Sequence, residues 1–321
     1  MSVTKRGRKS VLLSIALAAG SVVAAAGLAA STPVPVRTTP RNEVDPAAGG
    51  DWLAWSRSRE RGTSPFDLFA QHAADPAFRV NRKGTQAYGG GIDGTRLLYQ
   101  LIRGQFATES DLRLFDLQTR RLKPLPTGVN TKNWECCGTI SGDWILFSRG
   151  RAYSRATQLV LLRNLVTGEQ RVLDRLHNRN GLVSAGQING RYAVWGRCDP
   201  YPQCVVSRYD LTTASATALP TLPGKVTYSP SVNRYGTVYY LRSMRGCGKS
   251  VEIVKQPLVG LPEVLTSLPQ GHDVDVTYAY TLPPDPPAGT TTQIYYDNVV
   301  CRRQTWDIYR IDDVERPAPP P

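Results

Sequence analysis

The segment Gly49–Arg57, with the sequence GGDWLAWSR, returns almost unchanged at Ser141–Arg149 as SGDWILFSR. Looser copies complete a series in which each copy carries one marker aromatic residue. These aromatic residues are Trp55, Tyr99, Phe147, Trp195, Tyr240 and Tyr296. Successive markers are 44 to 56 residues apart, and internal similarity at such a period is typical of solenoids and propellers. The repeat therefore decides the fold class.

Each copy contains enough sequence for four short strands. A segment of small residues precedes the aromatic strand, and a second strand and often a third follow it. Val, Ile, Leu, Tyr and Trp dominate the strands, and Gly, Pro, Asn and Asp separate them. Because a single four-stranded unit cannot bury both of its faces, six units predict an all-β, six-bladed β-propeller with antiparallel blades. The blades are expected at residues 43–83, 84–130, 131–178, 179–222, 223–268 and 269–313.

The last repeat lacks a fourth strand, so the ring needs another way to close. Residues 314–321, VERPAPPP, are too rich in proline for a paired inner strand, and we expect a disordered tail there. The N-terminal segment 32–42 contains the run Val34–Arg37, which has no place in the repeats. We predict that this run forms the outer strand of the last blade, where an edge position tolerates Pro35.

The first 31 residues have the anatomy of a secretory signal peptide. Lys5, Arg6, Arg8 and Lys9 precede an apolar run that ends in small residues, and we expect cleavage after Ser31. An uncleaved membrane anchor is the alternative, because the run from residue 11 to residue 30 is long enough to span a bilayer. We expect a Sec-exported, extracytoplasmic protein with no transmembrane span once the signal is removed.

The full chain has a formal net charge of +13, of which four positive charges belong to the signal peptide. Outside the cell, a basic surface suits an anionic envelope polymer or an envelope protein as partner, and we expect no nucleic-acid partner. Dispersed, solvated charge is the simpler reading, because the mature chain has no run of Lys or Arg. The chain is expected to be a monomer.

Six cysteines in an exported chain are expected to be mostly oxidised. Cys198 and Cys204 bracket a short loop between two strands of the fourth repeat, so a disulfide across that hairpin is the simplest pairing. Cys247 and Cys301 fall in equivalent loops of neighbouring blades and are expected to form a second disulfide.

Cys136 and Cys137 remain, and they are adjacent. Consecutive Cα atoms are about 3.8 Å apart, below the usual disulfide range of about 4.4–6.8 Å, so a ring between them would be strained and stiff. We favour this vicinal disulfide over two reduced buried residues. A metal site is not expected, because no histidine lies at ligand spacing from the pair.

Residues just ahead of the aromatic strand of each repeat should approach one mouth of the central channel, where propellers commonly bind ligands. The candidate binding residues are Gln86, Tyr88, Trp134, Glu135, Cys136, Cys137, Ser184, Tyr228, Asp273 and Asp275.

Four arginines recur two residues after the marker aromatic: Arg57, Arg149, Arg197 and Arg242. We expect each to pair with an acid of the following strand, such as Asp67, Asp111, Glu252 or Asp307, because repeated positions usually serve repeated packing. The alternative is a ring of guanidinium groups that binds an anion.

The segment Tyr228–Ser243, YSPSVNRYGTVYYLRS, resembles the repeat of TolB-type six-bladed propellers, in which Pro-x-aromatic-Ser-Pro-Asp-Gly precedes an aliphatic strand. Pro230 and Gly236 match this outline, and the residues between them depart from it. The resemblance implies a secreted bacterial propeller that binds protein partners or envelope components. It carries over no catalytic residue and no cofactor.

Taken together, the sequence predicts a non-catalytic β-propeller that acts as a binding scaffold at the cell envelope. The alternative is a propeller enzyme, a lyase or glycan hydrolase, that uses carboxylates at the channel mouth. The Gly-x-Ser-x-Gly elbow of propeller-linked hydrolases is missing from the sequence. Clustered carboxylates with raised pKa values would favour the enzyme, and an aromatic, apolar funnel would favour binding.

Overall fold

The computed structural model describes residues 32–60, 63–103, 109–150, 157–222, 225–243, 249–283, 290–300 and 305–315. All of them belong to one compact unit, Ser31–Pro321. The predicted signal peptide, residues 1–31, lies outside the described residues. Among the described residues, no helix has the length and hydrophobicity that a membrane span requires.

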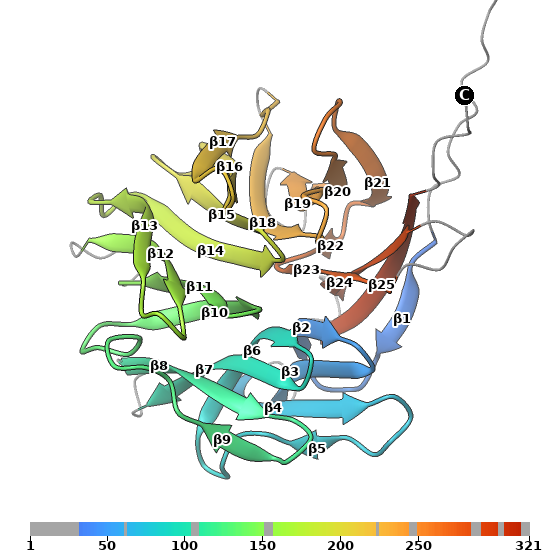
Figure 1. Ribbon diagram of the computed structural model, residues 1–321. Helices are drawn as coiled ribbons and strands as arrows, with labels where there is room; N and C mark the ends of the chain where they lie inside the picture. The colour runs from blue at the N-terminus through green and yellow to red at the C-terminus, as the bar shows by residue number, and fades with distance from the viewer. Residues whose placement is uncertain are drawn as a thin grey trace, which may run out of the picture. The chain divides into compact units, whose positions relative to one another are not determined.

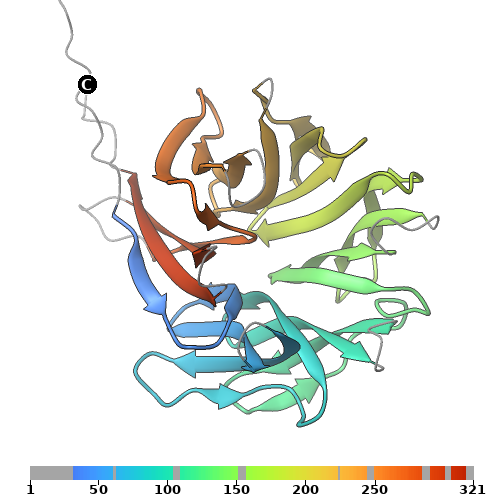
Figure 2. The same cartoon turned by 180° about the vertical axis from the view of Figure 1, so that it is seen from behind.

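Six antiparallel sheets form the blades of a propeller, as the repeat predicts (Figures 1 and 2). Blade 1 consists of β2 (Glu43–Gly49), β3 (Trp52–Glu60), β4 (Thr63–His72) and β5 (Phe78–Arg79). Blade 2 consists of β6 (Gln86–Asp93), β7 (Arg96–Arg103), β8 (Glu109–Asp116) and β9 (Arg121–Lys123). Blade 3 consists of β10 (Glu135–Ser141), β11 (Trp144–Arg149), β12 (Gln158–Asn164) and β13 (Gln170–Leu176).

Blades 4 and 5 follow the same order, whereas blade 6 differs in its pairing. Blade 4 consists of β14 (Leu182–Asn189), β15 (Tyr192–Cys198), β16 (Cys204–Asp210) and β17 (Ser215–Ala218). Blade 5 consists of β18 (Val226–Val232), β19 (Val238–Ser243), β20 (Val251–Gln256) and β21 (Glu263–Leu268). Blade 6 consists of β22 (His272–Asp273), β23 (Thr277–Thr281), β24 (Thr290–Val300), β25 (Thr305–Glu315) and β1 (Val34–Arg37). In blade 6 both β22 and β23 pair with β24, and β1 is added at the outer edge. The first strand of each blade lies nearest the centre of the ring (Figure 1).

The ring closes through β1, as predicted. This strand pairs antiparallel with β25 and aligns Val34 with Arg310, Pro35 with Tyr309 and Arg37 with Ile308. Figure 1 shows the blue N-terminal strand beside the red C-terminal one. The closing strand occupies the outer edge, where a proline without an N–H is tolerated. β25 runs on to Glu315, so the first two residues of the expected disordered tail lie in a strand.

The marker aromatics of the repeat form the core between blades. Trp55, Phe147 and Tyr296 are fully buried, and Tyr240 is 1% exposed. Each lies on the second strand of its blade, between the two faces that neighbouring blades cover. This burial explains why bulky apolar residues occupy consecutive positions on these strands.

Small residues allow the first strands to meet near the axis. A Cβ atom at Gly89 would overlap the backbone carbonyl of Asp45, and one at Gly90 would overlap the carbonyls of Leu98 and Gly138. Both positions therefore exclude a side chain, which accounts for the small-residue segment ahead of each aromatic strand.

Candidate binding site at the channel mouth

A β-bulge interrupts the first strand of each of blades 1 to 5. The register shifts between Val44 and Ala47, Tyr88 and Gly91, Cys136 and Thr139, Ala185 and Ile188, and Tyr228 and Ser231. In blade 6 the corresponding stretch separates β22 from β23. A bulge changes the direction in which a side chain points and is common beside functional sites.

Three of these bulges hold a non-glycine residue in the left-handed region. The φ angles are 51° at Asp45, 57° at Cys137 and 49° at Ser229. Such a conformation is uncommon for residues with a Cβ atom and costs free energy of order 1–3 kcal/mol. Its repetition at equivalent positions indicates that the directions of these side chains matter.

Asp45 opens onto a cavity of about 250 Å³. The cavity is lined by Asn42, Val44, Asp45, Phe66, Tyr88, Asp275, Asp297 and Trp306. These residues come from blades 1, 2 and 6, so the cavity lies where the ring closes. Its walls combine three carboxylates with three aromatic rings.

The carboxylates of the cavity oppose one another's ionisation. Burial, together with the charges of Asp275 and Cys137, raises the pKa of Asp45 from 3.8 to about 7, against a hydrogen bond from Ser56. Asp45 is half-buried because its remaining open side faces the cavity.

Asp297 is the buried member of this group, with 1% of its surface exposed. Its Oδ1 accepts hydrogen bonds from the backbone N–H groups of Asp275 at 3.0 Å and Val276 at 2.9 Å. Burial nevertheless raises the pKa of Asp297 well above its ordinary value, and the charges of Asp275 and Asp45 add to this effect. A positive charge in the cavity would relieve this repulsion.

Contacts with neighbouring residues hold the aromatic wall in place. The rings of Phe66 and Tyr88 have centroids 5.3 Å apart, and Gln86 donates a hydrogen bond to the Tyr88 hydroxyl at 2.7 Å. The backbone N–H of Trp306 donates to Oδ1 of Asn42 at 3.2 Å. The wall therefore joins the first blade to both of its neighbours.

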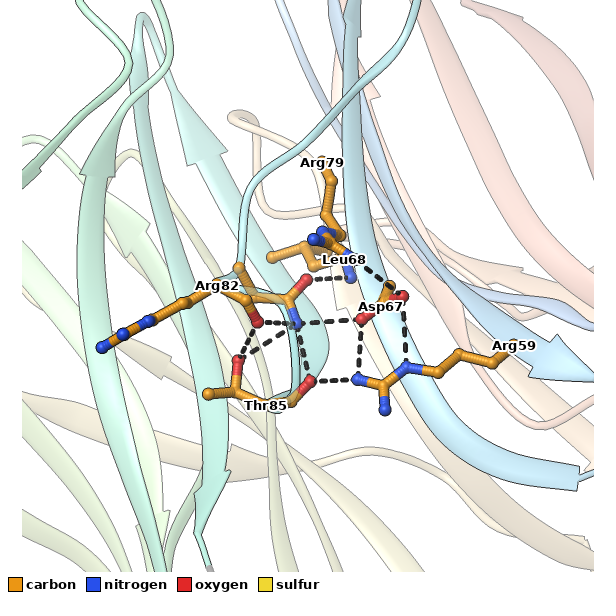
Figure 3. A network of polar contacts seen from close by, with 7 residues as sticks. Arg59, Asp67, Leu68, Arg79, Arg82 and Thr85 are labelled. Carbon is orange, nitrogen blue, oxygen red and sulfur yellow. Dashed lines mark hydrogen bonds and ion pairs between the residues drawn. The ribbon is translucent and has the colours of Figure 1, made fainter.

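A polar network is formed by residues that are close in sequence to Phe66 and Tyr88 (Figure 3). Asp67, the residue after Phe66, accepts hydrogen bonds from Arg59 at 2.9 and 3.2 Å and from Asn81 at 3.2 Å. Arg59 also donates to the carbonyl of Thr85 at 2.6 Å, just ahead of β6 and Tyr88. Burial alone would raise the pKa of Asp67, but these hydrogen bonds and the charges of Arg59 and Arg79 lower it overall.

Cys136 and Cys137 occupy in blade 3 the places that Val44 and Asp45 occupy in blade 1. Adjacent side chains of a regular strand point to opposite faces. Here the bulge turns both thiols to one side, and their Sγ atoms are 2.7 Å apart. Both are free thiols in this structure. The vicinal disulfide stays a prediction.

The structure places two of the candidate residues, Tyr88 and Asp275, in the cavity. Ser184 hydrogen-bonds to Cys137 and Trp134 to Cys136, so both lie beside the thiol pair. Asp273 pairs with Val299 in β22, and its Oδ1 accepts from the N–H of Val274 at 3.0 Å.

Glu135 and Tyr228 do not face the mouth, contrary to the prediction. Glu135 is fully buried, 2.8 Å from Arg149, and it accepts a hydrogen bond from Thr131 at 2.6 Å. Tyr228 is 5% exposed and donates to the carbonyl of Val274 at 3.4 Å, inside the packing of blade 5 against blade 6. Both residues serve the packing of the blades.

The recurring arginines pair with acids, which agrees with the structural interpretation. Arg242 lies 2.7 Å from Glu252, the expected partner on the following strand. The partners of the other three differ from the expectation: Glu43 for Arg57, Glu135 for Arg149, and Asp174 with Asp199 for Arg197. In blades 1 and 3 the acid comes from the first strand of the same blade.

One predicted disulfide is present in the structure, between Cys198 and Cys204. Cys247 and Cys301 lie outside the described residues. Within the described part of the chain, no group of three or more His, Cys, Asp or Glu side chains is placed to hold a metal ion.

Sequence reasoning missed Asp45, Asp297, Phe66 and Trp306. A signal for Asp45 existed, because aligning the repeats on the aromatics Trp55 and Phe147 places it opposite Cys137. Asp297 directly follows Tyr296, at the position where blades 1 and 3 have serine.

Replacing Asp45 by asparagine is expected to stabilise the protein at pH 8. A carboxyl whose pKa is raised on folding weakens the fold once the pH exceeds its unfolded pKa, and the full cost is present above about pH 7. One pKa unit corresponds to about 1.4 kcal/mol, and the open side of Asp45 reduces the effect, so we expect a gain of about 1–2 kcal/mol.

The measurement is urea unfolding at pH 8 and at pH 4, where the gain should vanish because Asp45 is protonated in the fold. Asp51→Asn, which removes an equal charge from an exposed turn, is the matched control. An equal gain from both variants at pH 8 would argue against a strained carboxylate in the cavity.

These features define a six-bladed β-propeller with an acidic, aromatic cavity lined by blades 1, 2 and 6. TolB from Acinetobacter baumannii is similar, with a TM-score of 0.52 and 13% identity over 82% of this chain and 64% of that chain. A putative TolB from Agrobacterium tumefaciens has a TM-score of 0.54 and 13% identity over 86% of this chain and 91% of that chain. A puromycin hydrolase mutant complexed with PGG has a TM-score of 0.50 and 12% identity over 83% of this chain and 46% of that chain.

The predicted resemblance to TolB-type propellers is thus confirmed at the level of the fold. No protein-family model matches the sequence, and no curated protein matches it. The function therefore has to be argued from the site.

Proposed function

We propose that the protein is a binding module of the cell envelope whose channel mouth takes up a cationic group of its partner. In this proposal the chain is exported and acts as a monomer without catalysis. The observation that carries it is the combination of three carboxylates and three aromatic rings around one cavity.

The charge of the cavity differs from that of the chain as a whole. The chain has a net charge of +13, yet Asp45, Asp275 and Asp297 converge at the mouth. Two effects contribute favourable free energy when such a cluster binds a cation. The cation relieves the mutual repulsion of the carboxylates, and aromatic faces attract it through their quadrupoles.

The size of the cavity limits what can enter it. Ligand pockets for drug-sized molecules are usually about 300–1,000 Å³, and this cavity is about 250 Å³. It therefore suits one ammonium or guanidinium group, such as a lysine or arginine side chain of an envelope protein. The net positive charge of the chain leaves contact with an anionic envelope polymer as a second, separate proposal.

Calorimetric titration with Nα-acetyl-lysine methylamide and its uncharged isostere, Nα-acetyl-norleucine methylamide, tests the proposal. We expect the lysine compound to bind at least about tenfold more tightly, and Asp45→Asn to remove most of this preference. Asp51→Asn should leave it unchanged. Equal binding of both compounds would refute the proposal.

The same carboxylates also favour an enzyme as the alternative function. Two interacting carboxyls with raised pKa values allow one to act as a general acid while the other is ionised, as a lyase or glycan hydrolase requires. Turnover of an acidic or neutral envelope glycan that is lost in both Asp45→Asn and Asp297→Asn would support this alternative. Turnover that survives both substitutions would exclude it.

A further inference from the structure

The thiols of Cys136 and Cys137 are a reactive group that the proposed binding function does not use. Both residues are half-buried in β10. The bulge holds their sulfur atoms 2.7 Å apart, with φ at Cys137 in the left-handed region at 57°. Two thiols held so close need little further movement to form a disulfide bond with each other.

Different neighbours surround the two sulfur atoms. Cys137 accepts a hydrogen bond from Ser184 of blade 4, whereas Cys136 interacts with Trp134 and with Ser148 of the adjacent strand. The hydrogen bond between the thiols raises the pKa of Cys136 well above its ordinary value, and burial adds to this effect. The same hydrogen bond lowers the pKa of Cys137, against burial and the charge of Asp275.

We propose that Cys136 and Cys137 form a thiol–disulfide exchange site for small disulfides that carry cationic groups. Cys137 is the attacking thiol, and Cys136 is the resolving thiol. This activity does not require that the cavity bind a partner.

The exchange takes place in two steps. The Cys137 thiolate attacks one sulfur of the substrate disulfide, whose S–S bond breaks, and the departing sulfur takes a proton to leave as a thiol. Cys136 then loses its proton and attacks Sγ of Cys137, which releases the second substrate thiol. The protein dithiol loses two electrons and two protons, and the substrate disulfide gains them.

The attacking thiol is chosen by the asymmetry of the pair. Cys137 occupies the bulge position and interacts with Asp45 and Asp275, which attract a cationic disulfide, so its sulfur meets the substrate first.

The charge around the pair selects the substrate. Asp45 and Asp275 interact electrostatically with Cys137, so negative charge surrounds the point of attack. An anionic disulfide is repelled from this region, and a cationic one is drawn to it. Cystamine and 3,3′-dithiodipropionate offer the same S–S bond with opposite charges, which makes them a matched pair of probes.

The test uses the full mature chain with Cys136 and Cys137 reduced. It is mixed with either probe, quenched with acid and N-ethylmaleimide, and examined by intact mass and peptide mapping. We expect cystamine to remove two hydrogens from the peptide that contains both thiols, at least about tenfold faster than 3,3′-dithiodipropionate does. Asp45→Asn should reduce this preference.

Single substitutions separate the two roles. Cys136→Ser should trap cystamine as a mixed disulfide on Cys137, because the resolving thiol is gone. Cys137→Ser should leave Cys136 at least about tenfold slower to react. Equal rates at the two cysteines, or no closed ring in the wild-type chain, would overturn the proposal. The Tm of each variant shows whether it is folded.

Discussion

Trp55→Ala is expected to lower the free energy of unfolding by about 3–5 kcal/mol, the usual range for removing a large aromatic side chain from a core. Trp55 is fully buried in the core shared by blades 1, 2 and 6. Arg37 of the closing strand lies over its ring at 4.5 Å, and Phe69 stacks on it with centroids 6.1 Å apart. The substitution therefore removes both core volume and a contact that closes the ring.

Trp52→Ala is the matched control, because Trp52 is only partly buried and contacts the ring of His72 in the same blade, with centroids 4.7 Å apart and ring planes tilted by 54°. Urea unfolding followed by circular dichroism gives both free energies. We expect the Trp52 variant to lose less than half as much as the Trp55 variant. Equal losses of unfolding free energy would mean that the marker aromatic residues do not determine the stability of the core.

Deleting residues 32–40 is expected to open the ring and to lower the free energy of unfolding by about 2–4 kcal/mol. This sum includes the burial of Val36, the cation–π contact of Arg37 and the cross-strand pairs of β1 with β25. The deletion also exposes the edge of β25, which becomes a template for pairing with other chains.

Thermal unfolding and light scattering test the deletion. A variant without residues 316–321 is the control, because it shortens the other end of the chain and leaves the β1–β25 pairing intact. A truncated chain that unfolds at the wild-type temperature and stays monomeric would contradict the role of β1.

The fold could be predicted because the sequence repeat determines it. An aromatic residue returns at a fixed place in each copy, and burial of that residue between blades is what the fold requires. The closing strand was also predictable, because the last repeat was one strand short and Val34–Arg37 had no other partner.

The site was only partly predictable, because a bulge changes which face a side chain occupies. Adjacent strand residues alternate between faces, whereas Glu135, Cys136 and Cys137 were all expected at the channel mouth. The structure turns Glu135 toward Arg149, whereas the bulge directs Cys137 beside Cys136. No periodicity in the sequence reveals the one extra residue of a bulge.

Asp297 and Trp306 were missed for a different reason. They reach the cavity from the last blade, more than two hundred residues after Asp45, and only ring closure brings these segments together. The carboxylates that result weaken the fold, since burial raises their pKa values. Such a destabilising arrangement is expected where a site serves binding rather than stability.

The most direct test of the binding proposal is a crystal structure of the protein with Nα-acetyl-lysine methylamide at pH 8. The proposal predicts that the ammonium nitrogen lies within about 3.2 Å of a carboxylate oxygen of Asp45 or Asp297, beside the rings of Phe66, Tyr88 and Trp306. An ammonium group bound elsewhere on the surface, with the cavity unchanged, would contradict it.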